Sequence, residues 1–223
     1  MARLSRITVP DLPHHVTQRG NRRQALFTEE GDYALYRDLM GERCAANGVT
    51  CWAYCLMPNH VHLILTPRTQ EGLSRAVGEA HRRYTAFVNA RARVTGHLFQ
   101  GRFSSAAMDE AHLMTAIRYL ALNPVRAKLA KRSQDWPWSS VAAHLAKKSD
   151  ALVSVKPVLR LSPRFADFLD LSFSEATELH DLETKSLTGR PLGNAAFLAK
   201  VEGKLGYSVT PRKRGRKPAS ERS

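Results

Sequence analysis

Residues 49–66 carry the pattern that most restricts how this chain can fold. Val49–Met57 is rich in strand-forming residues, Pro58-Asn59 favours a tight turn, and residues 60–66 read HVHLILT. Two strand-forming runs joined by a short turn predict a β-hairpin. Because alternate side chains of a strand point to opposite faces, the second strand has one aliphatic face and one face with two histidines.

The segments on either side of the hairpin follow a recognisable order. We expect strands at 15–19, 49–57, 60–66 and 103–108, and helices at 28–46, 73–94 and 109–122, with a further helical turn at 139–148. The order β-α-β-β-α-β, followed by helices, predicts an α+β fold. Its core is a ferredoxin-like (RRM-like) antiparallel sheet with packed helices.

Composition divides the chain into three predicted units. Residues 1–148 hold the sheet pattern, 149–205 are expected to form a small helical C-terminal extension, and 206–223 form a basic tail that cannot pack a core. No apolar run approaches the ~20 residues needed to cross a bilayer, so we expect no membrane partner. Three cysteines, an odd number, argue against a disulfide framework and favour the reducing cytoplasm.

Charge indicates the class of partner. The chain has 34 Lys and Arg against 20 Asp and Glu, a formal net charge of +14, which points to a polyanion such as nucleic acid. Basic residues gather in three places. A solvated cationic surface is the alternative interpretation of the clusters at 19–23 and 82–83, whereas the C-terminal run is expected to hold DNA without sequence specificity. The residues expected to contact DNA are Arg19, Arg22, Arg23, Arg82, Arg83, Arg212, Lys213, Arg214, Arg216 and Lys217.

Two groups of residues could carry chemistry. His60 and His62 share a strand face about 6–7 Å apart, close enough for two imidazoles to bind one divalent ion, although such a pair also occurs by chance. Tyr119 and Asn123 share a helix face, where a phenol and an amide oxygen could act as nucleophile and ligand. A boundary tyrosine and an N-cap before Pro124 are the alternatives. The other histidines show no ligand spacing, although His112 could approach Tyr119 along its helix.

Three ordered motifs carry a resemblance to a known family. They are YCLMPNHVHL at 54–63, RYLALNPVRA at 118–127 and WPWSS at 136–140. Together they resemble the single-tyrosine (Y1) HUH transposases, IS200-like, and more closely the branch associated with repetitive extragenic palindromes (REP).

This resemblance implies a metal-dependent endonuclease and strand transferase acting on single-stranded DNA with hairpins. His60 and His62 would bind Mg²⁺ or Mn²⁺, and Tyr119 would attack the scissile phosphate to leave a 5′-phosphotyrosine and a free 3′-OH. Asn123 falls where insertion-sequence relatives place a Gln as third metal ligand. The alternative is a noncatalytic DNA-binding regulator that retains the fold. The sequence leaves open a monomer or a homodimer, with Tyr119 serving its own histidines or a partner's.

Overall fold

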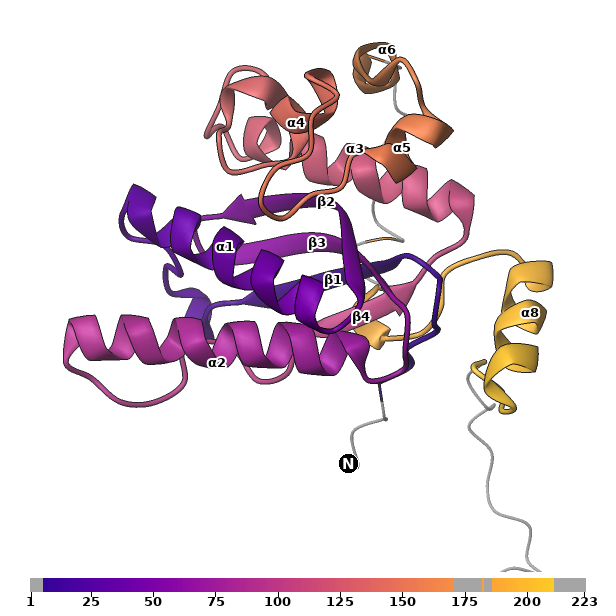
Figure 1. The fold of residues 1–223 in the computed structure, drawn as a ribbon, viewed down its shortest axis with the longest axis horizontal. Helices are drawn as coiled ribbons and strands as arrows, with labels where there is room; N and C mark the ends of the chain where they lie inside the picture. Colours follow the sequence, from indigo (N-terminus) through magenta and orange to yellow (C-terminus); the bar gives the residue numbers. More distant parts are fainter. Residues whose placement is uncertain (1–5, 171–181, 183–185, 211–223) are drawn as a thin grey trace, which may run out of the picture.

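A four-stranded antiparallel sheet organises the computed structural model, which describes residues 6–170, 182 and 186–210. Its strands are β1 (His14–Arg19), β2 (Val49–Met57), β3 (His60–Pro67) and β4 (Ser104–Ala107), in the spatial order β2-β3-β1-β4. With α1 (Glu30–Ala46) and α2 (Gly72–Ala92) as connections, this is the ferredoxin-like order that the sequence predicts (Figure 1).

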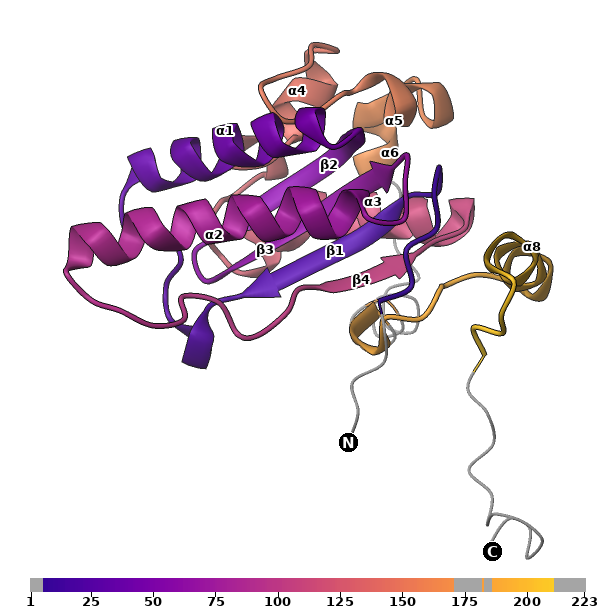
Figure 2. The same cartoon turned by 60° about the horizontal axis from the view of Figure 1, so that its bottom comes forward.

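Helices cover both faces of the sheet. One face packs against α1 and α2, and the opposite face packs against α3 (Glu110–Arg126), as Figure 2 shows. Short helices follow, namely α4 (Val141–Leu145), α5 (Lys156–Leu161) and α6 (Phe165–Asp170), and α8 (Ala195–Leu205) comes near the end of the described chain. Short 3₁₀ turns lie at Asn21–Arg23, Ser133–Asp135 and Ser186–Thr188.

Strand pairing sorts the side chains of β3 between these two layers. Val61, Leu63 and Leu65 are fully buried in the core cluster formed with α1 and α2. The alternate residues His60, His62 and Ile64 belong to the face beneath α3. The predicted apolar face of the hairpin is therefore confirmed.

Later segments of the chain cover both edges of the sheet. The WPWSS segment lies along β2, where Leu56 N–H donates to the Trp138 carbonyl and Ser140 N–H donates to the Tyr54 carbonyl, both at 2.8–2.9 Å. On the other edge, Leu192 N–H donates to the Ala107 carbonyl of β4 at 2.7 Å. Covered edges leave fewer strand groups to pair with another chain.

The helix that carries Tyr119 is longer than the sequence predicts. Asp109 caps it as expected, accepting from His112 N–H at 3.0 Å, but α3 continues through Pro124 to Arg126. Reading Asn123 as the N-cap of a next helix is therefore wrong. A proline removes only one intrahelical hydrogen bond, and Ala127 N–H still donates to the Asn123 carbonyl at 2.9 Å.

Residues beyond 148 contribute to the same cores. Leu152, Val153 and Val155 pack with the α1 and α2 layer, and Val158 packs with the α3 layer. The division at 148 and 205 stays a prediction. In the described ranges, no helix is long and apolar enough to cross a membrane, and the three cysteines are buried and unpaired.

Candidate active site

His60 and His62 lie on the sheet face beneath α3, at the end of β3 next to the Pro58-Asn59 turn. Their rings are 4.9 Å apart between centroids and nearly perpendicular, at 80°. His60 Nδ1–H donates to the Asn59 side-chain oxygen at 2.6 Å. Since that oxygen can only accept, His60 carries its proton on Nδ1 and has a lone pair on Nε2.

His15 is a third histidine of this site, and the sequence analysis missed it. It lies on β1, and the pairing of Thr17 with His62 and of His15 with Ile64 puts all of them on one face. His15 Nε2 is 3.0 Å from His62 Nδ1. His15 could have been found only from the register of β1 against β3, because diagonal neighbours across two strands leave no spacing signal in the sequence.

Tyr119 comes to the histidines from α3. Its ring centroid is 5.3 Å from that of His62 and 6.5 Å from that of His15, edge-on in both cases. The residue is buried, and the guanidinium carbon of Arg126 lies 5.4 Å from its ring centroid. Within one chain, Tyr119 therefore lies next to His62, one of the two predicted ligands.

Asn123 follows Tyr119 by one helical turn and shares its side of α3. It is buried, and its Nδ2 has no hydrogen-bond partner among the described residues. His112, by contrast, lies at the N-terminal end of α3, where its Nδ1 is 2.7 Å from Asp109 Oδ1.

Burial keeps the imidazoles of the site neutral. It lowers the pKa of His60 to about 4, with a smaller effect of Arg19, and the pKa of His15 also to about 4. The pKa of His62 is lowered well below its usual value, first by burial and then by His15, His60 and Arg19. Neutral imidazole is the form that binds metals.

These residues fit a divalent cation. His62 Nε2 is buried and meets no hydrogen-bonding group in the part of the chain that the structure describes. A nitrogen left in this condition costs free energy unless a ligand binds it. Across the same part of the chain, no three His, Cys, Asp or Glu side chains gather as metal ligands.

Basic residues flank the histidines at the turn end of the sheet. Arg19 pairs with His60 across β1 and β3. Arg22 and Arg23 follow in a 3₁₀ turn, are exposed, and have left-handed φ angles of 51° and 62°. Such strained positions cost about 1–3 kcal/mol each and concentrate at functional sites. Gly20 before them has no room for a side chain, since a Cβ would lie 2.2 Å from the Gln24 carbonyl oxygen.

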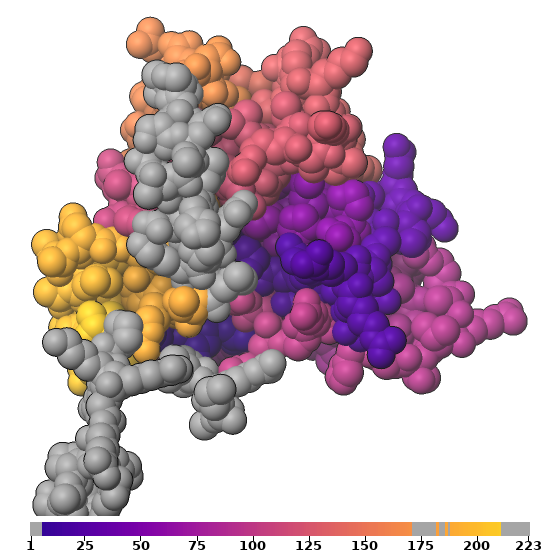
Figure 3. Space-filling view, turned by 180° about the vertical axis from the view of Figure 1, so that it is seen from behind, coloured from indigo at the N-terminus to yellow at the C-terminus, as the bar shows by residue number. Residues whose placement is uncertain are grey.

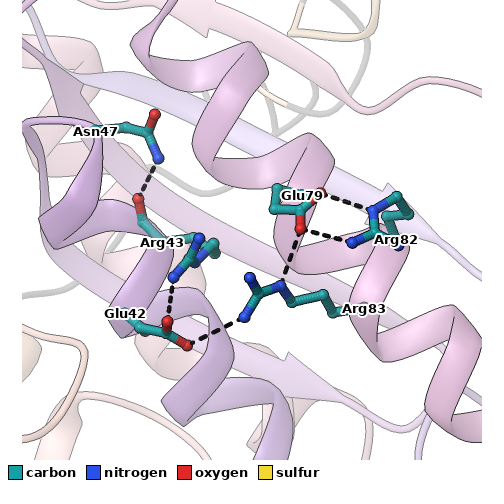
Figure 4. Close-up of polar contacts among 6 residues, drawn as sticks. All are labelled: Glu42, Arg43, Asn47, Glu79, Arg82 and Arg83. Atoms are coloured by element: carbon teal, nitrogen blue, oxygen red, sulfur yellow. Dashed lines mark hydrogen bonds and ion pairs between the residues drawn. The ribbon is translucent and has the colours of Figure 1, made fainter.

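The second predicted cluster, Arg82 and Arg83, lies elsewhere. It is on α2, in the layer on the opposite side of the sheet (Figure 2). Arg82 and Arg83 donate to Glu79 at 2.7–2.9 Å, and Arg83 also pairs with Glu42 at 3.7 Å (Figure 4). The structure does not bring these arginines to the histidines, and their contact with DNA stays a prediction. The tail residues Arg212, Lys213, Arg214, Arg216 and Lys217 lie outside the described residues.

The surface opposite α1 and α2 is formed by several parts of the chain. In Figure 3, the yellow C-terminal segment and the salmon and orange segments after α3 flank indigo and purple atoms of the N-terminal half. This is the side on which α3 packs and presents Tyr119.

Comparison with known proteins defines the class. The model of the IS200-like transposase family matches residues 8–123, more than half of the 223 residues, and this span contains His60, His62, Tyr119 and Asn123. The chain therefore belongs to the IS200-like transposase family. Among curated proteins, none matches it significantly.

One solved structure supports the fold, and a second is similar over a shorter part of the chain. A REP-associated tyrosine transposase bound to a REP hairpin is similar at a TM-score of 0.57 and 21% identity, covering 69% of this chain and 92% of that one. A protein from Deinococcus radiodurans, provisionally described as a transposase, aligns at a TM-score of 0.38 and 22% identity, covering 53% of this chain and 95% of that one.

Proposed function

We propose that this transposase cleaves and rejoins single-stranded DNA through Tyr119, with help from a divalent cation held by His60 and His62. The observation that carries the proposal is the approach of the Tyr119 ring to within 5.3 Å of the His62 ring, from a helix more than fifty residues away in sequence. Because both groups belong to one chain, the site we propose works within a single subunit, whether the protein is a monomer or a homodimer.

The protein groups have separate tasks in this reaction. The Tyr119 Oη would form a bond to the phosphorus atom as the bond from phosphorus to the 3′ oxygen breaks, leaving a 5′-phosphotyrosine and a 3′-OH. The phenol proton is lost and a proton is gained by the 3′ oxygen, so charge balances. Because the phosphotyrosine keeps the energy of the phosphodiester, a 3′-OH can reverse the step and join strands.

His60 and His62 would hold Mg²⁺ or Mn²⁺ through their Nε2 atoms, and the Asn123 amide oxygen is the proposed third protein ligand. A bound divalent cation would supply Lewis-acid stabilisation of the charge on the phosphate oxygens. The neutral state of both imidazoles supports this assignment, since a protonated ring cannot act as a ligand.

The proposed substrate is a single strand with a hairpin foot, like the REP hairpin of the similar structure. Arg19, Arg22 and Arg23 lie beside the histidines and would contact its phosphates. We place this protein in the REP-associated branch on its three motifs.

A covalent-adduct assay tests the proposal. Labelled hairpin DNA from the sequence flanking the gene is incubated with the full chain and Mn²⁺ or EDTA, then run on a denaturing gel. We expect a metal-dependent adduct that Tyr119→Phe abolishes, because phenylalanine has no oxygen to attack the phosphorus atom, and that His60→Ala also abolishes.

Two other results would contradict this mechanism. Binding without adduct, over several hairpins and both metals, would identify a noncatalytic DNA-binding regulator. Cleavage that survives Tyr119→Phe would make water the nucleophile.

A further inference from the structure

The two proposed metal ligands differ in what holds their second ring nitrogen. Nδ1 of His60 faces the Asn59 side-chain oxygen at 2.6 Å, which can only accept, so the tautomer of His60 is fixed. Nδ1 of His62 faces Nε2 of His15 at 3.0 Å, an imidazole nitrogen that can either donate or accept. His15 therefore lies behind His62 as Asn59 lies behind His60, but the contact allows either tautomer of His62.

The geometry of the pair is that of a direct ring-to-ring hydrogen bond. The rings are 9° from parallel, and their centroids are 5.2 Å apart. That separation is close to the 3.0 Å N···N distance plus two ring radii, so the bonded nitrogens lie between the centroids. His15 is 2% exposed and His62 is 7% exposed, so water does not compete freely for this bond.

Two proton arrangements satisfy the contact. In the first, His62 Nδ1–H donates to His15 Nε2, and His62 has a lone pair on Nε2, where a metal can bind. In the second, His15 Nε2–H donates to His62 Nδ1, and His62 Nε2 bears a proton that excludes a metal. The outer nitrogens, His62 Nε2 and His15 Nδ1, are both buried without a hydrogen-bond partner in the described ranges. Only a ligand on His62 Nε2 distinguishes the two arrangements strongly.

We propose that His15 is a positioning residue for the metal site, which accepts the Nδ1 proton of His62 and thereby turns the Nε2 lone pair of His62 toward the cation. This inference rests on the proposed function, because it assigns His15 to the same cation. A packing role alone would be served by an aliphatic side chain, as at its cross-strand partner Ile64. An acceptor behind a metal-binding histidine fixes the ring tautomer and orientation, and its loss costs about 10–100-fold in metal affinity.

Mn²⁺ titration of the full chain without DNA, followed by electron paramagnetic resonance of free Mn²⁺, tests His15. We expect His15→Leu to raise the Mn²⁺ Kd about 10–100-fold, and His15→Gln, which restores an accepting oxygen, to recover most of the affinity. The matched control is His14→Leu, a buried histidine on the same strand, whose ring contacts Val9 N and the Leu12 carbonyl oxygen. It should lower the melting temperature and leave the Mn²⁺ Kd unchanged.

A second readout follows the tautomer itself. In long-range ¹H–¹⁵N spectra with saturating Mg²⁺, His62 should bear its proton on Nδ1 in the wild type and in His15→Gln. A wild-type Mn²⁺ Kd in both His15 variants, or a His62 proton on Nε2 with Mg²⁺ bound, would overturn the inference. If His60→Ala also leaves the Mn²⁺ Kd unchanged, the proposed metal site is wrong. If His60→Ala weakens Mn²⁺ binding and the His15 variants do not, only this inference is wrong.

Discussion

The two faces of the sheet bury different kinds of side chain. Beneath α1 and α2, the β3 residues Val61, Leu63 and Leu65 are fully buried among apolar side chains. Beneath α3, the alternate residues of the same strand include His62, which is buried beside His15. The outer nitrogens of this pair, His62 Nε2 and His15 Nδ1, have no hydrogen-bond partner among the described residues. One strand thus serves a stabilising layer and a reactive layer at once.

The difference shows where this fold can tolerate an energetic cost. Apolar burial on the first face contributes about 25 cal/mol per Å² removed from water, whereas each unsatisfied buried polar group costs about 1–3 kcal/mol. The first face can compensate for the second because both belong to one sheet. Separate substitutions on the two faces should therefore separate stability from metal binding.

A substitution on the apolar face should change stability the most. Leu63→Ala should lower the free energy of unfolding by about 3 kcal/mol, through lost burial and the cavity left behind. Urea unfolding measures this change. Below the unfolding transition, the Mn²⁺ affinity should stay at the wild-type value, and a matching loss of affinity would show that the two faces are not independent.

The next predicted effect is a pH dependence of stability that comes from His81, a buried histidine on α2. Burial lowers the pKa of His81 to about 3, and its Nε2 lies 2.9 Å from the Tyr36 hydroxyl. Between pH 6.5 and 3, the unfolded chain binds a proton there and the folded chain does not, so stability falls as pH falls. In this range, His81 alone should change the free energy of unfolding by about 1.4 kcal/mol per pH unit.

Urea unfolding at pH 7, 6 and 5 tests that slope. His81→Phe should flatten the pH dependence by the contribution of one proton, since the ring keeps its contact with Phe99 but no longer titrates. Equal slopes in the wild type and His81→Phe would show that His81 does not carry the dependence.

Substitutions on the face beneath α3 should raise the free energy of unfolding, whereas Leu63→Ala lowers it. The double variant His15→Leu/His62→Leu removes both partners of the buried pair, and should raise the free energy of unfolding by about 1 kcal/mol. It should also abolish Mn²⁺ binding. Denaturant unfolding and metal titration of the same preparation measure both, and a destabilised variant would mean that the histidines support the fold.

The smallest predicted effect is on the salt dependence of hairpin binding, and it is tested with basic residues on the two sides of the sheet. Arg22→Ala/Arg23→Ala and Arg82→Ala/Arg83→Ala each change the net charge from +14 to +12, so they are matched in charge. The first pair should reduce the salt dependence of hairpin binding by about 1.4 in log–log slope, at about 0.7 per phosphate contact on a single strand. The second pair should have less effect, because both arginines are paired with Glu79.

Filter binding of a labelled hairpin from 50 to 300 mM salt measures the two slopes. Equal losses from the two pairs would place a DNA contact on α2 as well.

Local pattern predicted most of this fold. The bounds of β2 agree with the sequence analysis, and β3 and α2 agree to within one or two residues. The alternation at the start of HVHLILT also predicts that His60 and His62 share one face, and the strand pairing agrees. The end of α3 was not predictable in this way, because Pro124 resembles a helix start, while the packing of the helix on the sheet carries it to Arg126.

Local sequence periods account for the strand and helix order, the shared face of His60 and His62, and the shared helix side of Tyr119 and Asn123, because each depends only on the 2.0 and 3.6 residue periods. The folded chain adds three features: His15 contacts His62, Arg82 and Arg83 lie across the sheet from the histidines, and WPWSS covers the edge of β2. These depend on strand register, layer order and edge pairing. Contacts between distant segments set all three, and no local period encodes them.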